Sequence, residues 1–489
     1  MKRRFTAILL LATMVPVTLL AGGIVTNTNQ SASFIRMPVQ DATLSIDGAY
    51  YNPAGLVHLQ NGFHISVSNQ YVSQTRTIES DYALLKNKEY TGDVLAPLFP
   101  TFYAVYKMDK LAFAFNVNPI GGGGSANFTT GLPSFEYTLS GIPTILQQQL
   151  LPLDQTAEAL LGTDPGFRNI TGYNVDVAFD ASSLNWGFQL GAAYAINDMI
   201  SISLGARYIM AKNTYKGHLK DYMINAPAEY GGTQTPGNYL RTVATIVEPL
   251  SPPTATALNA QAAVLDVATA DQEVDDSQSG SGISPIVGLN FKISEQLNIG
   301  LKYEHKAAIK VKHEVGKDAL LYADGTEIDN DMPSLISLGA SFKPIEKFNI
   351  AVGCHYYLDK SANYGKRIDG VFVENKEVID KNFLEVGVGF EYLVTNNILL
   401  SLGYLRTQTG VNDKYHNDQA HSLNTNSIGV GGKYMVNENI GINLGFMTTM
   451  YEPYTKEYPA NLDSFIFQPY EETYNRSAMV IALGLDFKF

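Results

Sequence analysis

The sequence has very little cysteine, tryptophan and charge for its length. Among 489 residues there is one cysteine, Cys354, and one tryptophan, and only 17% of the residues are charged. A single thiol excludes an intrachain disulfide and any metal site built from several cysteines. Beyond the first 21 residues there is also no apolar run long enough to cross a bilayer as a helix. The chain is therefore neither a disulfide-stabilised domain nor a bundle of membrane helices.

What the chain has instead is an acidic balance and many tyrosines and glycines. The formal net charge is −13, and there are 29 Tyr and 42 Gly. Nucleic-acid binding needs a basic surface, so we expect no nucleic-acid partner. High tyrosine and low charge are typical of a chain rich in β-strands.

The N-terminus has the pattern of an export signal. The charged stretch "MKRR" precedes the apolar stretch "FTAILLLATMVPVTLLA", and small residues follow at Ala21, Gly22 and Gly23. This order predicts a signal peptide over residues 1–21, and hence a protein that leaves the cytoplasm. An uncleaved anchor is the alternative, but Pro16 and the short apolar span disfavour it.

From about residue 185 onward, short polar turns alternate with segments in which every second residue is apolar. In "SEQLNIGLKYEH" (294–305), Leu297, Ile299 and Leu301 share one face, and Asn298, Gly300 and Lys302 share the other. A period of two predicts β-strands. Fourteen such segments are expected, at 62–76, 96–108, 111–128, 172–195, 199–215, 281–293, 297–313, 332–343, 347–363, 380–393, 397–410, 424–436, 439–455 and 475–489.

The apolar faces of these segments carry aromatic residues at two recurring levels, and the connections alternate between short turns and long polar loops. Both features are typical of an outer-membrane barrel with two aromatic girdles. A large soluble β-sandwich is the alternative, since its strands alternate too. We predict an all-β protein, a 14-stranded antiparallel transmembrane barrel over residues 58–489, with long extracellular loops at about 129–171 and 216–280. The last strand ends in Phe489, an ending that resembles the signal read by the barrel-assembly machinery.

Residues 22–57 precede the first strand and do not alternate. They end in "NPAGL", which is Asn52, Pro53, Ala54, Gly55 and Leu56. This motif resembles the N-terminal hatch of the FadL family of outer-membrane long-chain fatty acid transporters. The stretch "NWGFQLGAAYAINDMISISLGARYIMAK" (185–212) resembles a strand pair of the same family.

The resemblance implies passive uptake of long-chain fatty acids or similar hydrophobic molecules across the outer membrane of a Gram-negative cell. A ligand would be caught by extracellular loops, pass to a pocket in the lumen, and leave through a lateral opening at a kink in the third strand. An importer of aromatic hydrocarbons or other lipophiles is the first alternative. A structural or adhesin-like barrel is the second. The resemblance implies a monomer with outer-membrane lipid around it and no cofactor.

The third predicted strand contains "NPIGGGG", in which Asn118 and Pro119 precede Gly121, Gly122, Gly123 and Gly124. Proline and glycine both interrupt strand pairing. The residues alone favour the start of a loop, while the family resemblance places its lateral opening here. On the second interpretation, bulky residues at Gly122 and Gly123 are expected to abolish uptake without affecting folding.

Candidate ligand contacts are of two kinds. Apolar residues of the first long loop could form a capture groove, or could merely cap the barrel mouth and bury one another. Basic residues near or in the lumen could hold a carboxylate head group, or could form an internal network of ion pairs. The candidates are Ile142, Ile145, Leu146 and Leu150 for the groove, and Arg207, Lys212, Lys216 and Lys302 for the head group.

Signals for catalysis and metal binding are weak. The eight histidines show no metal-binding spacing, and His305, the one candidate for a lipid-cleaving centre, has no serine obviously placed beside it. The acidic stretch 271–276 could hold a divalent cation, but a solvated acidic loop is the preferred interpretation. We predict no enzyme, no metal site and no cofactor.

Overall fold

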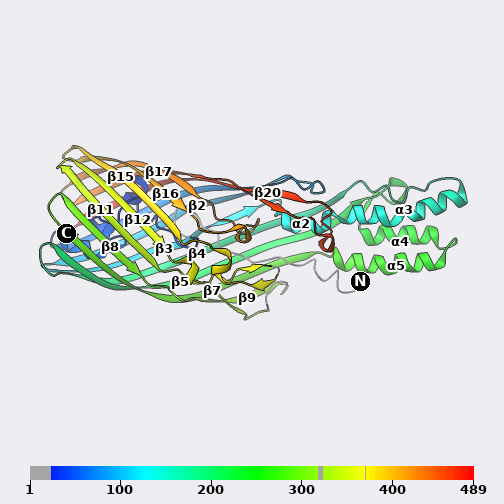
Figure 1. Ribbon diagram of the computed structural model, residues 1–489, viewed down its shortest axis with the longest axis horizontal. Coiled ribbons are helices and arrows are strands. Elements are labelled where there is room, and N and C mark those ends of the chain that lie inside the picture. Colours follow the sequence, from blue (N-terminus) through cyan, green and yellow to red (C-terminus); the bar gives the residue numbers. More distant parts are fainter. Residues whose placement is uncertain (1–23, 318–322, 369) are drawn as a thin grey trace.

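The computed structural model describes residues 24–317, 323–368 and 370–489, so the predicted signal peptide over residues 1–21 lies outside the described residues. In these ranges, fourteen long antiparallel strands form one closed barrel (Figure 1). The strand β1 pairs with β2 on one side and with the final strand β20 on the other, which closes the sheet. The barrel strands are β1 (Gly62–Ser80), β2 (Glu89–Met108), β3 (Leu111–Phe128), β4 (Tyr173–Ala195), β5 (Ile200–Asn225), β7 (Gln272–Lys292), β8 (Leu297–Glu304), β11 (Leu335–Ile345), β12 (Phe348–Tyr357), β15 (Phe383–Thr395), β16 (Ile398–Gln408), β17 (Thr425–Asn437), β18 (Ile440–Tyr451) and β20 (Tyr470–Lys488).

Shorter strands extend the barrel wall or decorate its loops. The strands β9 (Lys310–Lys317) and β10 (Glu327–Asp329) continue the wall beyond β8 and β11, and β9 pairs with β7. The strand β19 (Tyr454–Tyr458) continues β18 along β20. The small strands β6 (Thr233–Gln234), β13 (Arg367–Ile368) and β14 (Val371–Phe372) lie in loops. The predicted fourteen-stranded barrel is confirmed.

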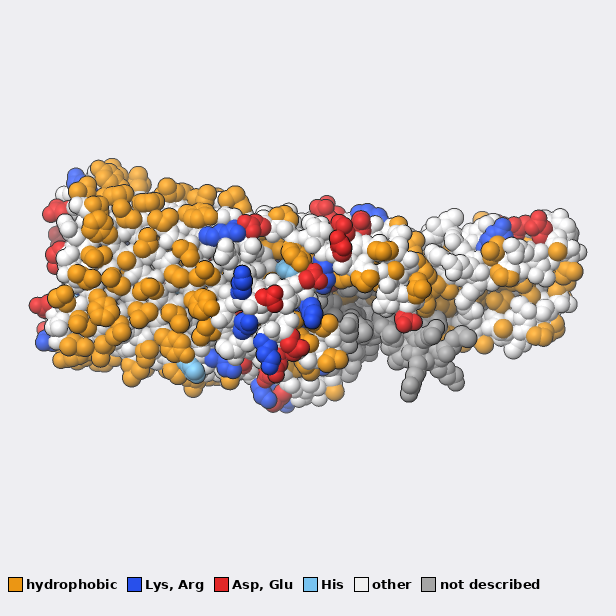
Figure 2. Space-filling view, viewed as in Figure 1, with side chains coloured by type: hydrophobic (Ala, Val, Ile, Leu, Met, Phe, Trp, Pro, Cys, Tyr) orange, Lys and Arg blue, Asp and Glu red, His pale blue; other side chains and the backbone are white. Residues whose placement is uncertain are grey.

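Over the hydrophobic band the strands turn mostly apolar side chains outward, while small and polar side chains predominate on the inward face. On β3, Phe113 is 46% exposed, whereas Asn116 and Asn118 are fully buried. Figure 2 shows the result on one face of the molecule, where hydrophobic side chains cover the barrel half broadly. An apolar exterior of this extent is stable only in contact with lipid. The face assignment made from the two-residue period is therefore correct.

Four helices project beyond one end of the barrel (Figure 1). The loop between β3 and β4 contains α2 (Pro133–Ser140) and α3 (Ile142–Leu161), and the loop between β5 and β7 contains α4 (Pro236–Val247) and α5 (Pro252–Ala268). Side chains of α3, α4 and α5 share one apolar core with the outer ends of β4 and β5. Among the described residues, no helix is long and apolar enough to span a membrane.

The second long loop is shorter than predicted. The expected range was 216–280, but β5 continues to Asn225 and β7 begins at Gln272. The acidic stretch 271–276 therefore lies mainly on a strand and not in a solvated loop. Its side chains face cations on neighbouring strands: Glu273 contacts Lys220 and Lys317, and Asp275 contacts Lys216. Cross-strand charge pairs of this kind stabilise an exposed sheet.

Residues 24–59, here called the N-terminal segment, lie inside the barrel. The segment contains α1 (Ala32–Arg36) and two short 3-10 helices, η2 (Ile46–Ala49) and η3 (Pro53–His58). The helix α1 contacts β16, β17, β18, β20 and β1, while η3 contacts β2, β3, β4, β5, β7 and β8. Because these strands lie around most of the barrel's circumference, the segment fills the part of the lumen that they surround. Other short helical turns are η4 (Ala228–Tyr230), η5 (Asp359–Ser361), α6 (Asn375–Val378), η6 (Asp413–Tyr415) and η7 (Leu462–Ser464).

Candidate functional site

The hydrogen-bond ladder between β2 and β3 is interrupted at the predicted kink. The two strands pair from Met108↔Leu111 to Phe102↔Val117, and pairing resumes only at Val94↔Ala126. Residues 95–101 of β2 and 118–125 of β3 therefore face each other without ladder pairing. Prolines contribute on both sides, since Pro97, Pro100 and Pro119 have no N–H to donate.

The other edge of β3 stays attached to β4, but with two irregularities. Pro119 pairs with Trp186 and Gly121 with Asn185, so that Ile120 is an extra residue. Gly122 pairs with Leu184 and Gly124 with Ser183, so that Gly123 is a second extra residue. Extra residues in one strand bend it and change its twist. The two bulges bend β3 away from β2, and the proline and glycine run is what permits them.

Gly122 has a backbone conformation that only glycine adopts at low cost. Its φ angle is 65°, and a Cβ atom added there would collide with the carbonyl oxygen of Ser183. Our expectation that a bulky residue at Gly122 would leave folding intact is therefore wrong, because such a residue would distort the pairing of β3 with β4.

The N-terminal segment binds the backbone of the kink. The Asn27 amide Nδ2 donates to the carbonyl of Gly122 at 2.5 Å, and the Asn27 backbone N–H donates to the carbonyl of Ile120 at 2.7 Å. The Gln30 amide Nε2 donates to the carbonyl of Pro119 at 3.0 Å. Three carbonyls of the bent strand, those of Pro119, Ile120 and Gly122, are thus satisfied from inside the lumen. We refer to Asn27 and Gln30 together as the latch.

The outer side of the interruption is apolar. Leu98 of β2 is 76% exposed and Leu95 is 55% exposed, both on the stretch that has no partner in β3. The interruption therefore joins a polar inner face, held by the latch, to a lipid-facing rim of leucines.

The "NPAGL" motif holds the N-terminal segment against the part of the wall formed by β5 and β7. The Asn52 amide Nδ2 donates to the carbonyl of Thr43 at 3.0 Å and to the Asn290 Oδ1 of β7 at 2.8 Å. Pro53 begins η3, and the Ala54 carbonyl accepts a hydrogen bond from the Ser201 hydroxyl of β5. A Cβ atom at Gly55 would lie 2.9 Å from the Thr43 carbonyl oxygen, so glycine permits the tight turn.

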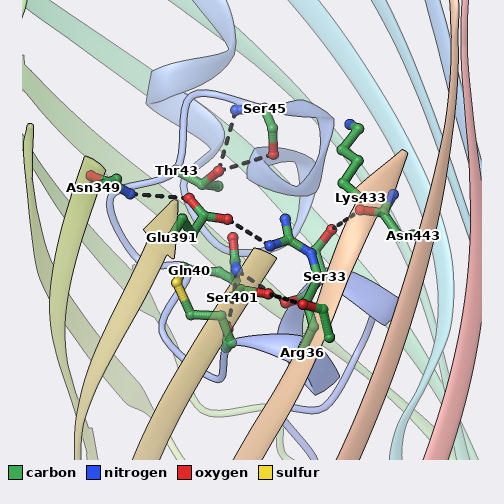
Figure 3. A network of polar contacts seen from close by, with 12 residues as sticks. Ser33, Arg36, Gln40, Thr43, Ser45, Asn349, Glu391, Ser401, Lys433 and Asn443 are labelled. Atoms are coloured by element: carbon green, nitrogen blue, oxygen red, sulfur yellow. Dashed lines mark hydrogen bonds and ion pairs between the residues drawn. The ribbon is translucent and has the colours of Figure 1, made fainter. Parts of the chain in front are cut away.

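Three ion-pair groups also tie the N-terminal segment to the wall. Arg36 reaches Glu391 at 2.6 Å, and Asn349 donates to the same carboxylate (Figure 3). Asp41 lies 2.7 Å from the Nε2 of His355, whose other ring nitrogen lies 2.9 Å from Glu385. Removing one partner of a buried pair leaves an uncompensated charge, so each of these contacts strongly favours the docked position.

The third group contains two of the predicted head-group residues, Arg207 and Lys302. Arg207 lies 2.5 Å from a carboxylate oxygen of Glu304, and Lys302 lies 2.6 Å from the other. Lys302 also donates to the carbonyl of Tyr50, and both cations lie over the Tyr50 ring. In this state the internal network occupies both side chains. They anchor the N-terminal segment.

The remaining predicted ligand residues lie in the extracellular part. Ile142, Leu146 and Leu150 of α3 are buried in the shared core of the loop helices, and Ile145 is half-buried. Lys212 and Lys216 are exposed on the outer face of β5, where Lys216 pairs with Asp275. The structure brings the α3 residues together, but it separates the two lysines from the lumen.

The helix α2 covers the barrel mouth, a feature that sequence reasoning missed. Its Glu136 accepts hydrogen bonds from the hydroxyls of Tyr90 and Tyr173, and its Tyr137 contacts Glu472 of β20 and Ser80 of β1. Burial raises the pKa of Glu136 above its usual range. Adjacent residues of α2 are thereby bound to four strands along one side of the opening, β20, β1, β2 and β4.

Basic residues of the upper lumen were also missed. Arg76 and Arg476 are directly paired Cα partners on β1 and β20, and both are buried. Lys366 lies in the loop after β12, where burial and the charge of Lys456 lower its pKa to about 7. The sequence already indicated the two arginines, since the two-residue alternation of their strands places both on the lumen-facing side.

No catalytic arrangement forms around His305. Its Nδ1 lies 2.9 Å from the Tyr303 hydroxyl, and the Ser284 hydroxyl donates to the His305 backbone carbonyl. Within the described ranges, no group of three or more His, Cys, Asp or Glu side chains has the geometry of a metal site.

A closed barrel with a lipid-facing exterior, long loops at one end and a chain segment packed in its lumen defines the class of outer-membrane β-barrel proteins. Residues 167–489, about two thirds of the chain, match the model of the outer membrane protein transport protein family, OMPP1/FadL/TodX. The chain belongs to this family, and the resemblance inferred from the sequence is confirmed. Membership implies the Gram-negative outer membrane. The matched range does not include the "NPAGL" motif or the kink.

The fold is similar to solved structures over nearly the whole chain. A FadL homologue of Pseudomonas aeruginosa has a TM-score of 0.62 at 12% identity, with 96% of this chain and 100% of that chain covered. The toluene transporter TodX of Pseudomonas putida has a TM-score of 0.55 at 11% identity, again with 96% and 100% covered. A comparison with curated proteins gives no significant match.

Proposed function

We propose that this protein carries hydrophobic small molecules passively into the cell and releases them sideways, through the interruption between β2 and β3. The observation that carries the proposal is the conjunction of an unpaired stretch of wall, a leucine rim on its outer side, and a latch on its inner side. A stable barrel normally pairs every strand. An interruption whose inner carbonyls are satisfied by a separate segment can open when that segment moves.

Physical chemistry favours a sideways exit for such a ligand. An apolar molecule that crossed the whole lumen would have to enter water in the periplasm, at a cost that grows with its apolar area. Exit through the wall transfers it directly into the hydrocarbon of the membrane. Only a downhill gradient is required, because the bilayer is the favoured environment.

The N-terminal segment acts, in this proposal, as a hatch. Its contacts to the wall include two charged pairs, Arg36–Glu391 and Asp41–His355, and the contacts of Tyr50 with Lys302 and Arg207. The latch at the kink consists of weaker, uncharged hydrogen bonds. The latch is therefore the part of the segment that can detach while the rest stays docked.

The extracellular helices provide the capture surface. The core shared by α3, α4 and α5 brings the two long loops together as one unit, and Leu160, Ile246, Leu250 and Val267 remain exposed on it. Exposed apolar side chains at the far end from the membrane band are suited to a first contact with a lipophile. The buried positions of Ile142, Leu146 and Leu150 give these residues a structural role in the resting state.

The ligand classes to be distinguished are long-chain fatty acids and uncharged lipophiles such as aromatic hydrocarbons. The buried cross-strand partners Arg76 and Arg476 support a ligand with an acidic head group, because they make this part of the lumen positively charged. A hydrocarbon carries no charge and would gain no attraction from such a pair.

Uptake by cells tests the proposal. A Gram-negative strain without its own fatty acid transporter should take up radiolabelled oleate, and toluene in a parallel assay, faster when it expresses this chain. Pruning of the loops 129–172 and 226–271 should remove the gain. A folded barrel that accelerates neither compound would favour the structural or adhesin-like alternative.

A further inference from the structure

The inner face of the kink carries a group of polar side chains whose hydrogen-bonding capacity is not met by the protein. Each is at least nine-tenths buried, and each has a polar atom without a partner among the described residues. Buried polar groups in proteins are normally satisfied, so an accumulation of exceptions requires an explanation. The group, called the polar cluster, consists of Asn27, Gln30, Asn116, Asn118, Ser183 and Asn185.

These residues are neighbours across three parts of the fold. Gly121 and Gly124 of β3 pair with Asn185 and Ser183 of β4, and Asn118 lies two residues before the first bulge, at Ile120. Asn27 and Gln30 reach the same stretch through the latch. A Cβ atom at Gly121 would lie 2.7 Å from the Asn185 amide nitrogen, which shows how closely β4 approaches the bend.

The unmet capacity is mainly that of acceptors. Asn27 uses its amide nitrogen on the Gly122 carbonyl, Gln30 on the carbonyls of Asn27 and Pro119, and Asn116 on the carbonyl of Ala49. Because carbonyls only accept, these bonds fix the orientation of all three amides. The atoms without a partner are therefore the amide oxygens Oδ1 of Asn27, Oε1 of Gln30 and Oδ1 of Asn116. Amide oxygens accept hydrogen bonds and repel a carboxylate.

We propose that the polar cluster binds a hydrogen-bond donor at the end of the transported molecule, such as the hydroxyl of an alcohol, of a phenol or of a carboxylic acid in its protonated form. This inference rests on the proposed function and specifies its ligand. A fatty acid would pass the kink as the neutral acid, which also avoids moving a charge toward lipid. An ether or an alkane of the same length has no hydrogen-bond donor for the unpaired oxygens.

The test compares three radiolabelled molecules of equal chain length: dodecanol, dodecyl methyl ether and dodecane. Binding to the detergent-purified full chain and uptake by expressing cells are both measured. We expect dodecanol to bind about fivefold to tenfold more tightly than the ether, the ratio that one neutral hydrogen bond supplies. Equal affinities for all three, with uptake intact, would overturn the inference and leave the proposed function standing. No binding or uptake of any of them would refute the proposed function itself.

Variants assign the preference to the polar cluster. Asn118 has neither side-chain polar atom paired, so Asn118→Leu removes no protein hydrogen bond and should fold normally. In this variant the alcohol-to-ether ratio should fall, because one of the unpaired acceptors of the polar cluster is removed. Ser337→Ala is the matched control, since Ser337 is a buried serine of β11 whose hydroxyl also has no partner. An unchanged ratio in Asn118→Leu, or a lost ratio in Ser337→Ala, would contradict the assignment.

Discussion

Removal of the latch should open the kink without unfolding the barrel. The double substitution Asn27→Ala, Gln30→Ala deletes two side-chain hydrogen bonds to the carbonyls of Gly122 and Pro119. A neutral hydrogen bond contributes about 1 kcal/mol net, so the closed state should lose about 2 kcal/mol. This corresponds to a roughly thirtyfold increase in the open population, because 1.4 kcal/mol is tenfold.

The open population can be measured through a buried thiol. Ser183 is 1% exposed and its hydroxyl lies beside Gly122, so Ser183→Cys in a Cys354→Ser background places one reactive group behind the closed kink. The rate of labelling by a lipid-soluble maleimide then follows the open fraction when opening and closing are fast. We expect labelling about thirty times faster in the latch variant, with an unchanged heat-dependent shift in gel migration as evidence of folding.

A control in the same segment separates the latch from general loosening. Gln40 also donates through its amide nitrogen to two carbonyls, but both of them, on Ser33 and Met37, belong to the N-terminal segment. Gln40→Ala should therefore leave the labelling rate within about twofold. The reasoning is refuted if the latch variant labels at the parental rate, or if Gln40→Ala accelerates labelling as much.

Three further predictions follow from the same contacts. Glu304→Gln should leave Arg207 and Lys302 without their shared carboxylate and destabilise the folded barrel by about 3–5 kcal/mol in thermal melts, while Glu295→Gln in a surface turn should change little. Leu146→Ala should destabilise the helical loop core by about 2–5 kcal/mol in thermal melts, whereas Leu160→Ala, at a position that is 68% exposed, should change little. Lys366 has a folded-state pKa of about 7, below the ordinary 10.5, so the folded loop prefers the neutral amine. The stability of the folded protein should therefore rise as the pH increases from about 7 to 10. Lys366→Met should remove this rise, and Lys376→Met, at an exposed position, should leave it unchanged.

Much of the barrel could be predicted because the relevant signal is local. The alternation in Leu297, Ile299 and Leu301 reports directly which side chains meet lipid, and the run from Pro119 to Gly124 marks the bend in β3. The predicted bounds of the second long loop were wrong because the contacts that decide them are not local. Glu273 and Asp275 read as a solvated loop, but lysines on β5 and β9, far away in sequence, hold them in a strand.

The candidate site depends on contacts that no local sequence pattern predicts. Asn27 and Gln30 sit in a stretch without periodicity, and only the closed fold brings them to carbonyls some ninety residues away. For Arg207 and Lys302 the sequence favours an internal ion network over a ligand, but inward phase alone does not say which partner each charge meets. The structure places Glu304 between them.

The most direct test of the account is uptake by a chain whose third strand is straightened. Deletion of Ile120 and Gly123 removes the two extra residues of β3 and restores a continuous ladder with β4. We predict a folded barrel that still binds hydrophobic ligand in detergent but has lost uptake into cells. Uptake at the parental rate in a folded deletion variant would contradict the lateral exit.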